Sequence, residues 1–195
     1  MARRRRADMI EETQGKLIAS ARQAFARLGY ADASMEEITT QAGLTRGALY
    51  HHFGDKKGLF AAVVLQIDDE IDIRLQRIGE QASTRWEGFR ERCRAYLTLA
   101  LDAEVRRIVL SDARAVLGER ARLSQPQCIA SLSSLLAAMV REGDIADCDC
   151  DALACMLHGS LEASALWIAE GESPPQRLER SLDALNRMLA GIKTA

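Results

Sequence analysis

Capping residues and glycines divide the stretch from Ser34 to Gly54 into two short helical segments. Ser34 stands three residues before Glu37, which is the spacing of a capping box, and Thr45 can act as the N-cap of the second segment. Gly43 and Gly54 follow the two segments, as expected at helix ends. Two short helices joined by a tight glycine turn predict a helix-turn-helix, which longer helices before and after it must brace.

Apolar residues at helical spacing predict those bracing helices on both sides. The preceding helix has Gly29 as its stop, and its inner face contains Leu17, Ala21, Ala24, Phe25 and Leu28. The following helix begins at Lys56 and continues to about Glu80, a length of roughly 35 Å. Its inner face comprises Phe60, Val63, Val64, Ile67, Ile71, Leu75 and Ile78.

Composition extends the helical prediction to the whole chain of 195 residues. Alanine, leucine, arginine and glutamate dominate, and strand-favouring runs of valine, isoleucine, threonine and tyrosine are nearly absent. A helix over about 151–169 is apolar on more than one face, and Ser173 followed by two prolines begins another. We therefore expect an all-α protein with about nine helices.

Charge and cysteine usage restrict the class of protein. The formal net charge is only -2, but residues 1–60 carry ten lysines and arginines against seven carboxylates, so a basic first part precedes an acidic remainder. The first residues lack the apolar core of a signal peptide, and no run of about 18 apolar residues predicts a membrane span. Five irregularly spaced cysteines do not form a disulfide framework, so we expect a cytoplasmic protein with reduced thiols.

Known catalytic motifs are absent from the sequence. It contains no glycine-rich phosphate loop, no H-E-x-x-H and no nucleophile elbow, and two of its three histidines fall within the helix-turn-helix. We therefore expect no enzyme, no cofactor and no metal site. A pure interaction module is the other alternative, but it would not need the combination of Arg46, Tyr50 and Lys56.

The stretch SMEEITTQAGLTRGALYHHFGDKKGLF resembles the DNA-binding signature of the tetracycline-repressor (TetR) family. The matching positions are Ser34, Ile38, Ala42, Gly43, Leu49, Tyr50, His52, Phe53 and Lys56. Two positions depart from the family pattern, because Thr39 replaces an alanine and Glu36 stands where a basic residue is common. Thr39 can offer its hydroxyl to a phosphate or pack at the surface, and Glu36 removes one phosphate contact.

The resemblance implies that the second short helix lies in the major groove of DNA. Arg46 is then the best candidate for a bidentate guanine contact, and Gly47 allows the backbone to approach DNA closely. Tyr50 can donate to a phosphate, and Lys56 adds a charge at a helix N-terminus. His51 can reach a base edge or a phosphate, whereas His52 and Phe53 brace the motif from inside. The predicted DNA-binding residues are Ser34, Thr45, Arg46, Gly47, Tyr50, His51 and Lys56.

A single motif of this size neutralises few phosphates, so selective binding needs two copies on two half-sites of a palindromic operator. We therefore expect a homodimer, with a four-helix interface built from the last two helices of each subunit. The predicted interface residues are Leu157, Ser160, Leu161, Ser164, Ile168, Leu178, Leu182, Leu185 and Leu189. The alternative for these residues is an ordinary core within one chain.

The middle of the chain, about 84–142, is expected to form the ligand-binding body. Apolar walls with a few polar groups are typical of small-molecule pockets. The candidate lining residues are Trp86, Phe89, Tyr96, Ile108, Met139, Met156, His158 and Trp167, for which core packing is the alternative role. No charged cluster identifies the effector.

Cys148 and Cys150, with Cys155 and His158 nearby, suggest a second hypothesis. Thiolates and an imidazole are zinc-type ligands, and two cysteines at a helix start are expected to have lowered thiol pKa values. The spacing matches no common zinc pattern, however, and cysteine is often buried as a small apolar residue. A thiol- or metal-sensing regulator of the same fold therefore stays open as an alternative.

Together these patterns predict a sequence-specific, ligand-responsive transcriptional regulator, most simply a repressor that a small-molecule effector releases from double-stranded operator DNA. Residues 1–55 are expected to form the DNA-binding domain, and residues 56–195 the ligand-binding and dimerisation domain. Within the first domain, residues 1–8 can form a flexible basic arm in which Arg3 to Arg6 contact DNA, or a solubilising tail.

Overall fold

Helices account for almost the whole chain in the computed structural model, which describes residues 2–118 and 125–194 and the side chains of 8–118 and 126–194. The elements are α1 (Ala2–Asp32), α2 (Met35–Gln41), α3 (Arg46–Phe53), α4 (Lys56–Glu80), α5 (Arg85–Thr98), the 3-10 helix η1 (Leu99–Leu101), the π-helix η2 (Val105–Ala113), α6 (Arg114–Leu117), α7 (Gln125–Glu142), α8 (Cys150–Ala169) and α9 (Pro174–Ala190). Within the described ranges the only β-type pairing is one isolated bridge between Ile145 and Lys193. The all-α prediction with about nine helices is confirmed.

The chain divides into two compact units. The described residues of Met1–Asp68 and of Arg107–Ala121 form one unit, and those of Asp69–Arg106 and of Arg122–Ala195 form the other. Both α4 and η2 are continuous helices that contribute residues to each unit. This division differs from the predicted boundary at Lys56, because the start of α4 and residues 107–118 group with the first unit.

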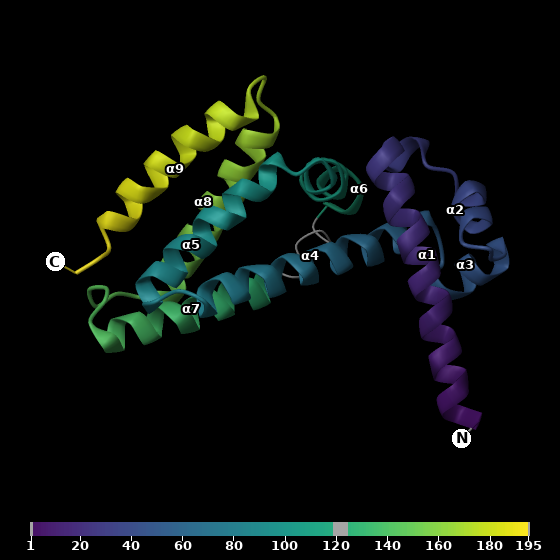
Figure 1. The fold of residues 1–195 in the computed structure, drawn as a ribbon, viewed down its shortest axis with the longest axis horizontal. Helices are drawn as coiled ribbons and strands as arrows, with labels where there is room; N and C mark the ends of the chain where they lie inside the picture. Colours follow the sequence, from purple (N-terminus) through teal and green to yellow (C-terminus); the bar gives the residue numbers. More distant parts are fainter. Residues whose placement is uncertain (1, 119–124, 195) are drawn as a thin grey trace. The chain divides into compact units, whose positions relative to one another are not determined.

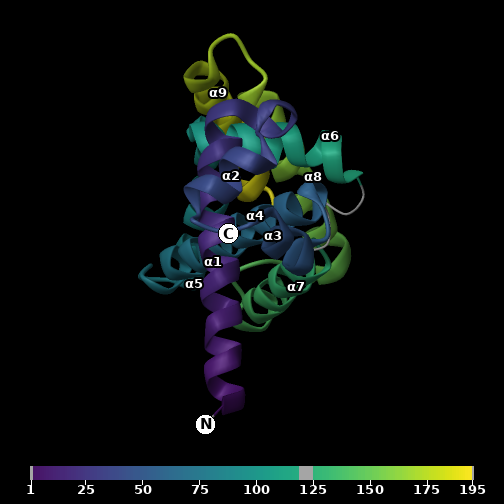
Figure 2. The same cartoon turned by 90° about the vertical axis from the view of Figure 1, so that its right-hand side faces the viewer.

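The core of the first unit lies where α1 and the start of α4 meet the two short helices, α2 and α3 (Figures 1 and 2). Phe60 packs edge-on against Phe25 at a ring-centroid distance of 5.0 Å and lies 4.9 Å from the ring of Tyr30. Burying a side chain of this size contributes about 1.5–3 kcal/mol. The fully buried apolar residues of this core are Leu17, Ala21, Phe25, Ile38, Leu49, Leu59, Phe60 and Val63.

The turn between α2 and α3 is fixed by backbone hydrogen bonds. Gly43 has φ +67°, and its N–H donates to the Thr40 carbonyl while the Leu44 N–H donates to the Thr39 carbonyl. This pair of hydrogen bonds is a Schellman motif, in which glycine is favoured at the position with left-handed backbone angles. The buried hydroxyl of Ser20 also donates to the Ile38 carbonyl at 2.8 Å, so a hydrogen bond from α1 helps to hold α2 in place.

Residues of η2 contact the chain at the break in α1. Gly29 leaves the helical conformation there, with φ +81°. The Arg107 guanidinium lies where a side chain at position 29 would stand, and it donates to the Leu28 carbonyl at 2.8 Å. The Asp112 carboxylate accepts from the Tyr30 N–H at 2.7 Å. Two polar side chains of η2 therefore satisfy backbone groups that the break in α1 leaves without helical partners.

The second unit is built around α8, which packs against α5, α7 and α9 (Figure 1). The predicted helices over about 151–169 and after Ser173 are present as α8 and α9, and the Asp149 carboxylate caps α8 by accepting from the N–H groups of Asp151 and Ala152. Arg85 donates two hydrogen bonds to Glu142, both at 2.7 Å, and so joins α5 to the end of α7.

One helix in the described residues, α8, is long and apolar enough to cross a bilayer by length and composition, with a mean hydropathy of 1.3. Core helices of water-soluble proteins meet the same criterion. The α8 helix packs against three other helices of its unit, and 28% of its apolar window is buried there.

Candidate nucleic-acid interface

The first two turns of α3 present their outer face to solvent, while the opposite face is buried. Thr45 caps the helix, since its hydroxyl oxygen accepts from the Ala48 N–H at 3.2 Å. Leu49 is fully buried, whereas Tyr50 is 53% exposed and His51 is also exposed. The exposed residues are Thr45, Arg46, Gly47, Tyr50 and His51, and His52 and Phe53 are half-buried. The structure thus brings five of the seven predicted DNA-binding residues together on one helix face.

Gly47 has no packing role within the chain. A β-carbon at this position would meet only the Thr45 hydroxyl oxygen, at an ordinary van der Waals distance of 3.7 Å. Because glycine in a helix costs about 1 kcal/mol relative to alanine, its presence without an internal reason fits a partner that approaches the α3 backbone.

Arg46 forms an ion pair with Glu36 of α2, with 2.8 Å between its guanidinium nitrogen and the Glu36 carboxylate oxygen. Both side chains are largely exposed, so the pair adds little to folding stability. It does hold the candidate base-contacting guanidinium against an acid at the start of α2. We predicted that Glu36 would remove a phosphate contact. Its pairing with Arg46 was not predicted, because two residues that are ten positions apart across a turn give no periodic signal in the sequence.

Lys56 is half-buried and engaged inside the first unit. Its ammonium group donates to the Ala31 carbonyl at 3.0 Å and lies 4.7 Å from the centre of the Tyr30 ring. Burial raises the pKa of Tyr30, and the nearby Asp55 carboxylate adds to this, so the ring stays an uncharged platform for the ammonium. Lys56 therefore braces α4 against α1, and a phosphate contact would use its remaining N–H donors.

Two predictions for α2 need revision, the capping box between Ser34 and Glu37 and the surface position of Thr39. The Ser34 hydroxyl oxygen caps α2 by accepting from the Glu36 N–H at 3.2 Å, and Glu37 pairs with Arg27 of α1 rather than completing a capping box. Thr39 is 2% exposed, and its hydroxyl donates to the carbonyls of Met35 and Glu36. Neither a phosphate contact nor surface packing by Thr39 is therefore compatible with this structure.

The backbone of the first residues continues α1 as a helix rather than forming an irregular arm. The side chains of Arg3 to Arg6 lie outside the described residues. Their contact with DNA stays a prediction.

The structure separates the predicted ligand-pocket residues. Phe89, Ile108 and Met139 are buried in the core at 1% exposure or less, while Met156 is 73% exposed. Tyr96 and His158 are half-buried. Only two members of the set line described cavities, and these cavities differ: Trp86 lines one between α5 and α9, and Trp167 lines one between α8 and α9.

The predicted dimer-interface residues also divide into two groups. Five are buried within the chain itself at 9% exposure or less, so a partner subunit could not bury them further; these are Leu157, Ile168, Leu178, Leu185 and Leu189. Ser160, Leu161, Ser164 and Leu182 are partly exposed. Three leucines of the α9 stripe, Leu178, Leu185 and Leu189, therefore belong to the intrachain core, which was the alternative role.

The cysteines do not assemble into a metal site in the described part of the chain, where no group of three or more potential ligands lies together. The expectation of lowered thiol pKa values is wrong for Cys150, whose pKa is raised by burial and then by Cys148 and the flanking carboxylates. Burial raises the pKa of the Cys93 thiol to about 12, which fits an unreactive core residue.

A capped two-turn helix with an exposed polar face, held on a buried three-helix core, is the geometry of a helix-turn-helix DNA-binding protein. The described residues of Asp69–Arg106 and of Arg122–Ala195 form a second helical unit. The comparisons agree with this class. Residues 17–63 match the family model for bacterial regulatory proteins of the tetR family, and residues 86–192 match the tetracyclin repressor-like C-terminal domain.

The chain belongs to the TetR family of transcriptional regulators, and it is a DNA-binding regulator. A crystal structure of a TetR-family transcriptional regulator from Pectobacterium atrosepticum is 53% identical, with a TM-score of 0.90 over 96% of this chain and 97% of that one. The transposon Tn10 TetC protein of Escherichia coli is 26% identical over 77% of each chain. The HTH-type transcriptional repressor AcnR of Corynebacterium glutamicum is 38% identical over 29% of this chain and 30% of its own length.

The substitution Gly47→Ala is expected to separate folding from DNA binding. The new methyl group has space inside the protein, so the stability should be unchanged or rise by up to about 1 kcal/mol. Affinity for operator DNA should fall by about 5-fold or more, because the methyl group lies between the helix backbone and DNA. Thermal unfolding and fluorescence anisotropy with labelled duplex measure the two effects.

The matched control is Gly15→Ala, at an exposed glycine of α1 with nothing within 4 Å of an added β-carbon. It should gain similar stability and keep its DNA affinity. Full DNA affinity in Gly47→Ala would show that the α3 backbone does not approach DNA at this point.

The substitution Glu36→Gln is expected to strengthen binding to all duplexes while weakening discrimination between them. It removes a negative charge near the phosphates and the carboxylate that holds Arg46. Affinity for unrelated DNA should rise, with a salt dependence steeper by about one phosphate contact. The control is Glu80→Gln, at an exposed glutamate that ends α4, and it should alter neither property. Unchanged affinity and base preference in Glu36→Gln would rule out this role of the pair.

Proposed function

We propose that this regulator is a cytoplasmic homodimer that represses transcription by binding a palindromic operator and leaves it when a small-molecule effector binds. The observation that carries the proposal is the exposed face of α3, from Thr45 to His51, which the chain does not use for its own core. AcnR, a relative of the DNA-binding part, is named a repressor, which supports repression as the outcome.

We assign DNA binding to residues 1–55, and ligand binding and dimerisation to residues 56–195. The two family matches support this division, because the first ends at residue 63 and the second begins at residue 86. Residues 107–118, which group in space with the first unit, then belong to the second domain by sequence and contact the first at the break in α1.

We place the dimer interface on the outward face of α8 and the adjoining part of α9. Met156, Trp167 and Met188 are large apolar side chains that are 73%, 40% and 41% exposed. Gly159 and Ala163 lie between the first two on the same face of α8 and permit close helix approach. The cavity of about 370 Å³ beside Trp167 and Met188 lies on this face, and a second subunit can fill it.

Release from DNA follows from linkage. The effector prefers a conformation of the dimer in which the two α3 helices no longer match the half-site spacing. The ratio of its affinities for this conformation and for the DNA-binding conformation sets how far operator affinity falls. The start of α4 is suited to transmit this change, because a side chain at Gly58 would clash with the Phe53 carbonyl of α3. With so close a contact, α4 cannot shift there without moving α3.

Arg46 and Tyr50 are expected to make different contributions to DNA affinity. Arg46→Ala should lower operator affinity by about 1–3 kcal/mol and relax the preference at one base position, because a bidentate guanine contact is lost. Tyr50→Phe should weaken binding to all duplexes about equally, since only a phosphate contact is removed. The operator is first selected from random duplexes with the parent protein, and each variant is then titrated against it and against a scrambled duplex.

Arg187→Ala, an exposed arginine of α9, is the control and should bind as the parent does. If Arg46→Ala and Tyr50→Phe both bind the selected operator like the parent, α3 is not the DNA-contacting helix. If the parent selects no sequence at all, the proposed function itself fails.

The substitution Met156→Glu is expected to produce a folded monomer with weak operator binding. It places a charge in the centre of the proposed interface, where it would be buried without a partner on dimerisation. Sedimentation velocity measures the loss of dimer, and anisotropy measures the loss of operator affinity. Ile73→Glu, at a 52% exposed apolar residue of α4, is the matched control and should stay dimeric. A dimeric Met156→Glu protein would move the interface elsewhere.

A further inference from the structure

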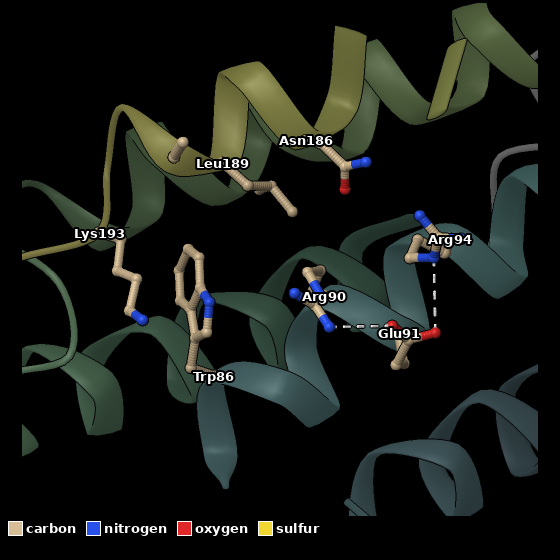
Figure 3. A pocket seen from close by; sticks show the side chains of 8 residues that line it. Trp86, Arg90, Glu91, Arg94, Asn186, Leu189 and Lys193 are labelled. Carbon is tan, nitrogen blue, oxygen red and sulfur yellow. Dashed lines mark hydrogen bonds and ion pairs between the residues drawn. The ribbon is translucent and has the colours of Figure 1, made fainter. Parts of the chain in front are cut away.

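A cationic pocket lies between α5 and α9 in the second unit (Figure 3). Its volume is about 570 Å³, which is enough for a small organic molecule. The lining residues are Trp86, Arg90, Glu91 and Arg94 of α5, with Asn186, Leu189, Ala190 and Lys193 from α9 and the residues after it. Of these residues, only Trp86 was among the predicted pocket residues.

The charge of this pocket is opposite to the net charge of residues 61–195 as a whole. Two arginines and Lys193 face one carboxylate, although residues 61–195 carry more acidic than basic side chains. Glu91 lies 3.4 Å from Arg90 and 3.5 Å from Arg94, and its single negative charge can offset only one of the three positive charges. A concave site with two uncompensated positive charges concentrates small anions.

Arg90 supplies a specific donor in this pocket. Its Nε atom is buried and has no hydrogen-bond acceptor among the described residues. A buried donor without an acceptor is unfavourable, and such groups usually have a partner. Figure 3 shows the Arg90 guanidinium between the two helices, beside Trp86 and below Leu189. Its side chain as a whole is 41% exposed, so the terminal nitrogens, rather than the buried Nε, are the donors that a ligand oxygen can reach.

The remaining walls match an apolar body next to the anionic group. The exposed edge of Trp86 provides apolar surface, with the buried Leu189 behind it, and the Lys193 ammonium lies 5.6 Å from the centre of the Trp86 ring. The Asn186 side chain points toward α5 from the opposite wall (Figure 3). A purely inorganic anion would leave the apolar surface unused, so the pocket fits a molecule with both parts.

We propose that the α5/α9 pocket binds a small organic acid, with its carboxylate on the terminal nitrogens of Arg90 and its apolar body against Trp86. The planar guanidinium can donate two parallel hydrogen bonds to a carboxylate, which an ammonium cannot do. Arg94 and Lys193 strengthen the attraction through their charge. That this acid is also the effector rests on the proposed function, whereas binding to the pocket does not.

Trp86 makes a direct binding test possible. The chain has two tryptophans, so Trp167→Phe leaves Trp86 as the single fluorescent reporter and keeps an apolar residue on α8. The probe is 4-nitrobenzoate, and 4-nitrobenzyl alcohol is its uncharged analogue with the same quenching nitroarene. We expect saturable quenching of Trp86 by the acid and only linear, collisional quenching by the alcohol.

Variants in the same single-tryptophan background test the assignment to Arg90. Arg90→Met should weaken 4-nitrobenzoate binding on the order of 10-fold or more, and Arg90→Lys should fall between it and the parent. Arg94→Met should have a smaller effect, which keeps the proposal testable if Arg90→Met does not fold. Arg187→Met, on α9 but outside the pocket lining, is the matched control and should bind normally.

Three results would overturn the proposal: equal saturable binding of the alcohol, no saturable binding of the acid, or unchanged binding in the folded arginine variants. Tighter binding of 4-nitrophenyl phosphate than of the carboxylate would overturn the assigned head group. Operator titrations with and without 4-nitrobenzoate then test the effector role. Binding to the pocket without any change in operator affinity removes only that role, whereas failure of the parent to bind any operator removes the proposed function.

Discussion

The packing of Phe60 against Phe25 and Tyr30 is the interaction on which the DNA-binding unit depends. Isolated helices as short as α2 and α3, with seven and eight residues, are not stable in water. They exist here because Ile38 and Leu49 are completely buried and both short helices pack against α1. The first turn of α4 adds a close approach at Gly58 to the Phe53 carbonyl, at the end of α3.

In this arrangement the outer face of α3 does not pack against other parts of the unit. The orientation of its polar residues depends on local electrostatic interactions instead. Glu36 and Glu37 both begin α2, where acidic side chains are favoured by the helix dipole, and each pairs with an arginine from another helix. An acidic residue on a DNA-facing surface opposes phosphate. Its pairing with Arg46 reduces that opposition while restricting the directions in which the guanidinium points.

Local signals in the sequence were sufficient for the elements but not for the partners of individual side chains. The caps Ser34 and Thr45 and the start of α4 at Lys56 follow from residue type and spacing, and the structure contains all three. Periodicity predicted the apolar stripe of α9 as well. It could not say whether Leu185 and Leu189 face their own chain or a second one, because both environments require the same residues. The ties of Lys56 to Ala31 and of Arg46 to Glu36 depend on tertiary packing that no spacing rule contains.

Two helices of the described chain, α4 and η2, contribute residues to both units, and under the proposed function each is a route by which an occupied α5/α9 pocket can act on DNA binding. They differ in how a change could be transmitted. The first turn of α4 is held against α1 by buried aromatic packing, and it lies close to the Phe53 carbonyl of α3. In contrast, η2 is a π-helix, a conformation common at functional sites, and it holds α1 through the polar contacts of Arg107 and Asp112. Polar contacts at an exposed or half-buried site exchange with water at small cost, whereas buried aromatic contacts do not. A reversible change is therefore more readily accommodated at the η2 contact with α1 than in the aromatic core beneath α3.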